Sequence, residues 1–270
     1  MIFTGPISVI CSTYNRPDAL KLSIESLQHQ TDKNFEIIIA DDGSTSETKK
    51  LVDRYCNLHI PITHVWHEDN GFRLAAIRNL ACRAASGSYL LFIDGDCIAT
   101  PKWVEHHRNL AEKGWTVTGQ RILLSQSCTE QVISTDCDIS NPSFLACLNL
   151  YRSGLINRPW PMLSLPLGPL RKVGKHNWKN IRGCNWGLWK SDLEAVNGFD
   201  EAFRGWGHED ADLAVRLLNQ GIKIKSGSFT SPVLHLWHPD AERKNASKNM
   251  DLVLKRLKDK TTLPFKGMNF

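Results

Sequence analysis

Four short apolar segments, separated by segments with helical periodicity, constrain the fold of this chain more than any other feature. The apolar segments cover residues 6–12, 35–43, 62–68 and 89–96, and the helical segments between them cover residues 18–30, 46–56 and 73–86. Most of the apolar segments are continuous rather than alternating, which is typical of parallel strands that are buried on both faces. This order of elements predicts an α/β fold with a doubly wound, mostly parallel sheet.

Acidic residues stand where two of these predicted strands end. Ligands of doubly wound sheets bind beyond the carboxyl ends of the strands, so we expect these acids to share one site. Asp94 and Asp96 follow the fourth strand and are separated only by Gly95. Two carboxylates in this spacing would hold a hard divalent cation such as Mn²⁺ or Mg²⁺. The alternative is a polar turn, in which Asp and Gly are common without a metal.

The other strand ends offer contacts for a nucleotide. Asp41 would accept hydrogen bonds from a ribose or a base, whereas Asp42 would cap the next helix. Tyr14 offers a ring for stacking, and Arg16 would neutralise phosphate charge. Arg78 would reach the nucleotide from its helix or remain solvated. The sequence has neither a Gly-x-Gly-x-x-Gly motif nor a P-loop lysine motif, so a Rossmann dehydrogenase or a P-loop kinase is not supported.

A second acidic cluster lies more than 100 residues further along the chain, where residues 205–210 read Gly-Trp-Gly-His-Glu-Asp. Carboxylates at the start of a helix are stabilised by the helix dipole, which would account for Glu209, Asp210 and Asp212 without any chemistry. It would not account for the glycines, which let the backbone approach a ligand closely. Nor would it account for Trp206, whose ring face suits the C–H side of a sugar.

The remaining segments follow a less regular pattern. We expect helices over residues 101–114, 211–221 and 248–258, strands over residues 116–124, 181–190, 223–227 and 233–238, and a long loop over residues 157–180 that orders on substrate binding.

Composition indicates a cytoplasmic protein. The eight cysteines include no Cys-x-x-Cys pair and are expected to be reduced thiols. The first residues lack the basic region of a signal peptide, and no apolar run approaches the ~20 residues that span a bilayer. The net charge of +5 fits plain solubility or attraction to a nucleotide diphosphate. The basic residues 255–270 would contact the inner face of the membrane or form a solvated tail.

Two stretches in the first hundred residues, 8–44 and 71–97, together resemble the donor half of glycosyltransferase family 2. Residues 184–212 resemble the carboxyl-terminal region of the β-1,4-galactosyltransferases and of bacterial chondroitin-type polymerases. The resemblance extends over about residues 5–240. It implies the GT-A fold in a single domain over residues 1–270. In that domain about residues 1–100 form the nucleotide-sugar half, about 101–240 the acceptor half, and about 241–270 a C-terminal helix and tail.

The same resemblance implies roles for individual residues. On the donor side, the nucleotide contacts would come from Thr13, Tyr14, Arg16, Asp41 and Asp94, and the metal ligands from Asp94, Asp96 and His235, with His238 as the alternative to His235. On the acceptor side, Asp210 would be the catalytic base, and Glu209 and Trp206 would contact the acceptor. Independently of the resemblance, Arg78 would contact the nucleotide, and Trp186 or Trp189 would offer a further ring to the acceptor, with at least one of the two in the core. His208 stands where the family pattern varies and receives no role.

These roles are consistent with the chemistry of an inverting transfer. Such a reaction needs one carboxylate to accept the proton of the acceptor hydroxyl and a cation to stabilise the departing diphosphate. We therefore expect a metal-dependent glycosyltransferase that moves a sugar, with galactose or N-acetylgalactosamine favoured, from a UDP-sugar to a saccharide or lipid-linked saccharide in bacterial surface polysaccharide synthesis. The cofactor would be Mn²⁺ or Mg²⁺, and no nucleic acid would be involved.

Two other functions are compatible with parts of the sequence. A nucleotidyltransferase acting on sugar phosphates would also use paired acids and a metal, but it usually has a glycine-rich loop after the first strand, which residues 12–18 lack. A non-catalytic carbohydrate-binding module would use Trp206, Trp186 and Trp189 as a sugar platform, but it would not need Asp94 and Asp96.

Overall fold

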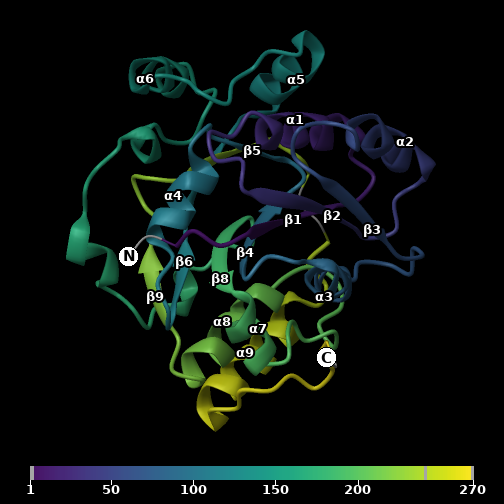
Figure 1. Cartoon of the computed structure of the whole chain (residues 1–270), viewed down its shortest axis with the longest axis vertical. Coiled ribbons are helices and arrows are strands. Elements are labelled where there is room, and N and C mark those ends of the chain that lie inside the picture. The colour runs from purple at the N-terminus through teal and green to yellow at the C-terminus, as the bar shows by residue number, and fades with distance from the viewer. Residues whose placement is uncertain (1–2, 240–241, 269–270) are drawn as a thin grey trace.

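A seven-stranded sheet forms the centre of the computed structural model, which describes residues 3–239 and 242–268 (Figure 1). In spatial order the strands are β3 (Ile62–Trp66), β2 (Phe35–Asp41), β1 (Ile7–Thr13), β4 (Tyr89–Asp94), β8 (Asn185–Trp189), β6 (Trp115–Thr118) and β9 (Lys223–Ser226). Strands β1 to β4 are parallel, as predicted, and β9 is parallel to β6. Strand β8 runs antiparallel to both of its neighbours.

Helices cover both faces of this sheet (Figure 1). One face packs against α1 (Pro17–Gln28), α2 (Ser46–Tyr55) and α4 (Trp103–Leu110), and the other against α3 (Leu74–Ala84), α7 (Lys190–Ala195) and α8 (Glu209–Asn219). The C-terminal helix α9 (Ala246–Asp259) packs against α8. The helix predicted over residues 248–258 is thereby confirmed.

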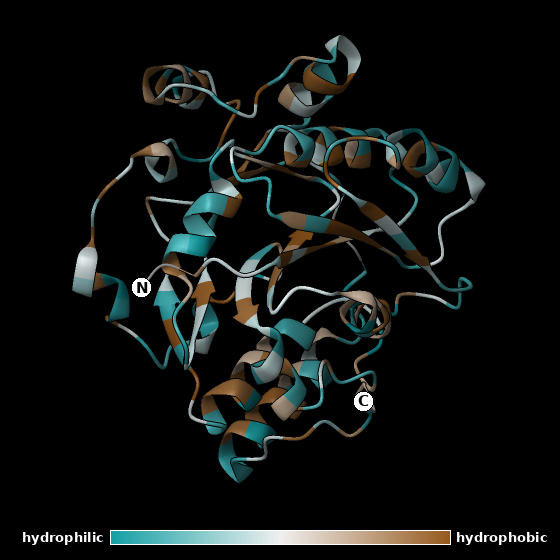
Figure 2. Ribbon diagram, in the orientation of Figure 1, coloured by the Kyte–Doolittle hydropathy of each residue, from teal (hydrophilic) through white to brown (hydrophobic). Residues whose placement is uncertain are grey.

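The continuous apolar runs in the sequence follow from this layering. Val9 and Ile37 face the core on the α1 side of the sheet, whereas Ile10 and Ile38 face the core on the α3 side, and all four are fully buried. Figure 2 shows the same arrangement, with hydrophobic colour on the strands and hydrophilic colour on the outer surfaces of the helices. A strand between two helical layers has no solvent face that would need polar residues.

The strand predicted over residues 116–124 is wrong in one respect, because the structure divides it into β6 and β7 (Gln120–Leu123). Strand β7 belongs to a second sheet, in the order β5 (Cys97–Ala99), β10 (Pro232–His235) and β7. The break falls at Gly119, where an added Cβ would lie 2.3 Å from the side chain of Asn185. This close approach leaves room only for glycine at the junction between β6 of the first sheet and β7 of the second.

Residues 126–180 contain more structure than the sequence indicated. Helices α5 (Gln126–Thr135) and α6 (Phe144–Arg152) were not predicted, and they project beyond α1 at the top of Figure 1. The segment predicted as a long loop contains three short 3₁₀ helices, Trp160–Met162, Gly168–Lys172 and Trp178–Asn180. Buried Arg171 fixes this segment, because its guanidinium donates hydrogen bonds to the carbonyls of Leu165, Ser226 and Ser228.

The helices of the described residues are too short or too polar to cross a membrane. The basic C-terminal segment begins within α9, and its last two residues, 269–270, lie outside the described part of the chain.

Candidate active site

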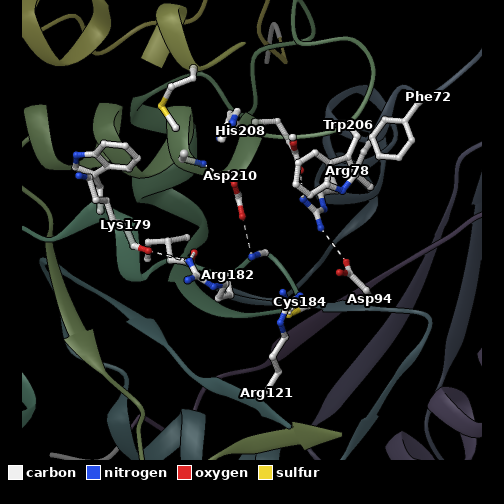
Figure 3. A pocket seen from close by; sticks show the side chains of 18 residues that line it. Phe72, Arg78, Asp94, Arg121, Lys179, Arg182, Cys184, Trp206, His208 and Asp210 are labelled. Atoms are coloured by element: carbon white, nitrogen blue, oxygen red, sulfur yellow. Dashed lines mark hydrogen bonds and ion pairs between the residues drawn. The ribbon is translucent and has the colours of Figure 1, made fainter. Parts of the chain in front are cut away.

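A cleft of about 460 Å³ lies between the carboxyl ends of the parallel strands and the start of α8 (Figure 3). Its walls bring together the two acidic clusters that the sequence separates by more than 100 residues. The lining residues are Phe72, Leu74, Arg78, Asp94, Arg121, Trp178, Lys179, Ile181, Arg182, Gly183, Cys184, Trp206, Gly207, His208, Glu209, Asp210, Ala211 and Met250. Of the strand-end acids that were expected to share one site, Asp94 lines this cleft together with Glu209 and Asp210, whereas Asp41, Asp42 and Asp96 do not.

Arg78 of α3 connects the two sides of this cleft. Its side chain is buried, and each guanidinium nitrogen has a separate partner. Nε donates to Oγ of Ser12 at 3.1 Å, Nη2 to Oδ1 of Asp94 at 3.0 Å, and Nη1 to Oε1 of Glu209 at 3.2 Å. The side chain thus joins the ends of β1 and β4 to the first residue of α8. The alternative of a solvated arginine is wrong, because α3 points Arg78 into the protein.

The acids of the second cluster are placed by an unusual entry into α8. Gly205, Gly207 and His208 all have positive φ, at 73°, 103° and 75°, and the helix begins at Glu209. Glycine adopts this backbone region without strain, whereas His208 is the one non-glycine residue of the three. The turn directs Asp210 into the cleft, where its Oδ2 accepts the N–H of Gly183 at 3.1 Å and its Oδ1 accepts the N–H of Ala211 at 2.7 Å.

Glu209 is nearly buried beside Asp210, and its ionisation is unfavourable. Burial and, to a smaller extent, the charge of Asp210 raise the pKa of Glu209 from its ordinary value of 4.5 to about 7, although Arg78 opposes the shift. The third acid, Asp212, is not the solvated helix-start charge that the sequence suggested. It is fully buried and pairs with Arg216 at 2.7 Å and with Arg256 of α9.

The raised pKa of Glu209 predicts a pH dependence of stability in the free protein. Between pH 4.5 and 7 the folded state holds the proton of Glu209, whereas the unfolded state has lost it, so stability falls as pH rises through this window. Glu209→Gln should remove this contribution and make the variant lose less stability, by more than about 1 kcal/mol, between pH 4.5 and 7.5. Urea unfolding of both proteins at the two pH values measures the difference, and equal losses would contradict the prediction.

Asp96 of the first acidic cluster lies against two histidines, His235 at the end of β10 (Pro232–His235) and His238 just after it. Strand β10 pairs antiparallel with β5, which places His235 opposite Cys97. Nε2 of His235 lies 3.6 Å from Oδ1 of Asp96, and Nε2 of His238 lies 3.3 Å from Oδ2 of the same carboxylate. Both histidines therefore lie beside the carboxylate of Asp96. The sequence left open which of them would bind the metal, and the structure places both near the same ligand.

This cluster fits a divalent metal ion. Donor atoms of Asp96, Cys97 and His235 lie within 4.8 Å of one another, and burial lowers the pKa of His235, which favours the neutral imidazole that binds metals. Carboxylate oxygen with imidazole nitrogen suits Mn²⁺. Gly95 keeps the two acids close to β1, because an added Cβ would lie 3.0 Å from the carbonyl oxygen of Ser12.

The predicted nucleotide loop lies at the ends of β1 and β3. Thr13 is buried, and its hydroxyl has no hydrogen-bond partner among the described residues. Tyr14 is 48% exposed and donates its hydroxyl to Oδ2 of Asp69 at 3.0 Å. Arg16 is ion-paired with Asp18 at 3.1 Å rather than free. Of these side chains, only the ring of Tyr14 presents a large exposed surface for stacking.

The two acids after β2 differ from their predicted roles. Asp41 is fully buried, and its carboxylate accepts the N–H of Ser44 at 2.8 Å and contacts Nε2 of His64 at 2.9 Å. It therefore exposes no oxygen to a base or ribose in this structure and instead fixes the turn after β2. Asp42 does not cap α2 but accepts the N–H of Arg73, at the start of α3, at 2.9 Å.

The two tryptophans predicted to contact an acceptor lie in different environments. Trp206 is half-buried and lines the cleft near Phe72 and Arg78 (Figure 3). The prediction for Trp186 is wrong, because its side chain is fully buried against Phe92 and Phe199 and donates Nε1 to Thr116. It belongs to the hydrophobic core.

The lining residues that were not singled out from the sequence include Arg121, Lys179, Arg182 and Cys184. Lys179 and Arg182 lie in or next to the segment that was predicted as a long loop, whereas Arg121 lies in β7. Only the excess of positive charge in the loop segment could have indicated Lys179 and Arg182, since they form no spaced motif.

Comparison with known proteins identifies the classes of protein that share this arrangement. The sequence profile of "Glycosyl transferase family 2" matches residues 8–164, and the profile "N-terminal domain of galactosyltransferase" matches residues 171–239. The first match covers more than half of the chain. The boundary between the two profiles falls in the segment of 3₁₀ helices.

Curated relatives and solved structures extend this result. The chain is 27% identical to a chondroitin synthase of Escherichia coli over 82% of this chain and 33% of the relative. It is 29% identical to a validoxylamine A glucosyltransferase of Streptomyces hygroscopicus subsp. jinggangensis (strain 5008) over 81% of this chain and 52% of the relative. The chain thus spans a third to about half of the length of these relatives. The structure of GalNAc-T7 with UDP, GalNAc and Mn²⁺ covers 94% of this chain and 50% of its own, with a TM-score of 0.63 at 14% identity. This likeness shows a shared GT-A fold.

Proposed function

Because this chain belongs to glycosyltransferase family 2, we propose that it transfers a sugar from a UDP-sugar to a saccharide acceptor with inversion at the anomeric carbon. The observation that carries the proposal is the cleft in which Arg78 holds Asp94 of the donor side and Glu209 of the acceptor side. Asp210, from the same helix start, faces this cleft without a basic side chain bound to its carboxylate among the described residues. An acid in that state is available to accept a proton.

On the donor side, Asp94, Asp96 and His235 would hold Mn²⁺ or Mg²⁺, with His238 beside them. When bound, the cation would neutralise the charge of the departing diphosphate. Tyr14 offers an exposed ring to the base, and Thr13 offers a hydroxyl without a partner among the described residues. The structure of GalNAc-T7 was solved with UDP and Mn²⁺, which supports this choice of donor and cofactor.

On the acceptor side, Asp210 would accept the proton of the attacking hydroxyl. Two backbone N–H groups, from Gly183 and Ala211, hold its carboxylate in the cleft. The hydroxyl oxygen would bond to the anomeric carbon as the bond from that carbon to the diphosphate breaks. Attack from the face opposite the diphosphate inverts the configuration.

Glu209 and Trp206 would position the acceptor. Glu209 is held by Arg78. Because its pKa is about 7, near neutral pH its protonated form can donate a hydrogen bond to a sugar hydroxyl and its ionised form can accept one. The ring of Trp206 offers an apolar face for a sugar. A role for Trp186 is not part of the proposal, because it is buried in the core.

Several finer expectations remain part of this proposal. The galactosyltransferase profile over residues 171–239 favours galactose or N-acetylgalactosamine as the transferred sugar. The resemblance to a chondroitin synthase supports a role in bacterial polysaccharide synthesis on a saccharide or lipid-linked acceptor. We further propose that residues 1–270 form a single domain in the cytoplasm and that any contact with the membrane is made through the basic residues 255–270.

A panel of UDP-sugars with Mn²⁺, scored by UDP release with and without saccharide acceptors, tests the proposed function. UDP-galactose or UDP-N-acetylgalactosamine should give the highest rate, and EDTA should lower that rate at least about a hundredfold until Mn²⁺ or Mg²⁺ is restored in excess. Full activity in EDTA would contradict the metal site. Release of pyrophosphate in place of UDP would instead indicate a nucleotidyltransferase.

A further inference from the structure

Positive charge is concentrated in one segment of this chain. Between Asp138 and Asp192 the sequence has eight lysines and arginines and neither Asp nor Glu. The whole chain carries a net charge of only +5, so the rest of it is net negative. A single-sign segment of this length creates a local field that attracts anions.

Part of this charge gathers in a second cavity, of about 270 Å³, that adjoins the cleft. Arg121, Arg158 and Arg182 line it, and Arg121 and Arg182 also line the main cleft. In Figure 3 the guanidinium groups of Arg121 and Arg182 lie below Asp210, on the side away from Trp206. The two cavities therefore share a wall made of two arginines.

None of these three arginines is paired with an acid in the described part of the chain. The guanidinium of Arg121 donates to the sulfur of Cys184 at 3.8 Å. Arg158 donates Nη2 to the carbonyl of Arg121 at 2.9 Å, and its buried Nε has no partner among the described residues. Arg182 donates to the carbonyls of Lys179 and Ile181. No acid lines the cavity itself.

The buried Nε of Arg158, which has no hydrogen-bond partner among the described residues, is unfavourable unless a ligand accepts from it. Arginine is suited to this use, because its planar fork binds carboxylate and phosphate oxygens in pairs. The cavity wall is also held in place, since Arg171 ties the segment to the carbonyls of Ser226 and Ser228. The cavity thus has the charge and rigidity of an anion site.

The position of the cavity assigns it to the acceptor rather than to the donor. Its lining comes from the region between β6 and β7, from residues 158–182, and from residues 224–228. No residue of β1 to β4, or of the loops at their carboxyl ends, belongs to it. The proposed donor contacts lie in those strands and loops, in β10, or, for His238, just after β10. An acceptor whose reacting hydroxyl lies at Asp210 would therefore extend across the shared wall and place a neighbouring part of the saccharide among the arginines.

We propose that Arg121, Arg158 and Arg182 bind the anionic group of the acceptor, and that the acceptor is consequently an acidic saccharide bearing a carboxylate or a phosphate. This inference rests on the proposed function. Side chains of Thr118, Gln120 and Asn180 in the same cavity would serve the hydroxyls of the charged sugar. The volume is below that of cavities for drug-sized ligands, which suits one charged ring.

Three methyl glycosides compare the possible charges on the acceptor: methyl β-D-glucoside, its uronic acid and its 6-phosphate. With the UDP-sugar that gives the highest rate, kcat/KM should be at least about tenfold higher for one of the two anionic glycosides than for the neutral one. If the uronic acid has the higher kcat/KM, the site binds a carboxylate; if the 6-phosphate has the higher kcat/KM, the site binds a phosphate. Isothermal titration of the three glycosides in the presence of UDP and Mn²⁺ measures the same preference without turnover.

Variants separate the pocket from general electrostatics. Arg158→Gln and Arg182→Gln should each lower the ratio of anionic to neutral kcat/KM about tenfold, mainly through KM. Arg152→Gln is the matched control, because it removes the same charge from an exposed position on α6. Arg182 is itself exposed, so its variant should fold even if the Arg158 variant does not.

The outcomes distinguish this inference from the proposed function. If the wild-type protein releases no UDP from any UDP-sugar, the proposed function fails. If it transfers sugar but shows no preference for either anionic glycoside, or if Arg152→Gln lowers the ratio as much as the pocket variants do, the anion site is wrong and the proposed function stands.

Discussion

Asp210→Asn should lower kcat for sugar transfer by about 10²- to 10⁴-fold, the range expected for loss of a general base. The amide keeps the shape of the side chain and retains an oxygen that can accept the N–H of Gly183. It cannot take up the proton of the acceptor hydroxyl. The Kd for UDP, measured by isothermal titration, should remain within about twofold of the wild-type value, because Asp210 lies on the acceptor side of the cleft.

A matched control for this variant is available on α9. Asp251→Asn makes the same chemical change at an exposed position, and its kcat should equal that of the wild type. Wild-type kcat in Asp210→Asn would contradict the assignment of the base. The base would then have to be sought at Glu209, the other acid at the start of α8, and Glu209→Gln would be the variant to compare.

Asp212→Asn should lower the free energy of unfolding by about 3–5 kcal/mol, the usual cost of breaking a buried ion pair from one side. Asp212 and Arg216 are both fully buried in α8. Arg256 brings a second guanidinium from α9 to Asp212, and it also pairs with buried Asp200. Asparagine would leave two buried arginines with one carboxylate between them.

Urea unfolding measures this change, with Asp251→Asn again as the control. The exposed substitution should alter stability by less than about 0.5 kcal/mol, whereas the buried one removes a large part of the roughly 5–15 kcal/mol that stabilises a typical domain. If Asp212→Asn unfolds within about 1 kcal/mol of the wild type, the buried network contributes little and α9 must be held by its apolar contacts, including Val253.

The parallel part of the sheet could be predicted because its signal is local. Residues such as Val9 and Ile10 are neighbours in the sequence and lie in cores on opposite faces of the sheet, so each strand appears as an unbroken apolar run. The acids at the strand ends were predictable for the same reason. Asp94 and Asp96 stand directly after such a run.

The division of residues 116–124 could not be predicted, since its cause lies far away in the sequence. Neither Thr118 nor Gln120, the neighbours of Gly119, marks a break between two strands, and only the side chain of Asn185 in β8 shows why a glycine is required there. The helices α5 and α6 were missed because their buried residues, among them Cys128, Val132 and Cys147, contact a small separate core. The sequence shows no long apolar stripe for these helices.

The residues of the candidate site that belong to sequence motifs were predicted. Those that are brought together only by the fold were missed. The sequence marked Asp94, Glu209 and Asp210, but it gave no reason to expect Arg78 between the first two. Trp186 was assigned to the acceptor because tryptophan is common in sugar sites, and its position on a central strand places it in the core instead. The unpaired arginines form no motif and became visible only as the lining of a cavity.

The bridge formed by Arg78 limits how members of this family can exchange parts. Its guanidinium is completed by Ser12 and Asp94 from one profile region and by Glu209 from the other. A chimaera that replaces residues 171–239 to change acceptor choice therefore has to retain an acid at position 209, or Arg78 is left as a buried charge with one acidic partner fewer. A change of acceptor specificity by exchange of this region therefore requires that the new region still supply an acidic partner for Arg78.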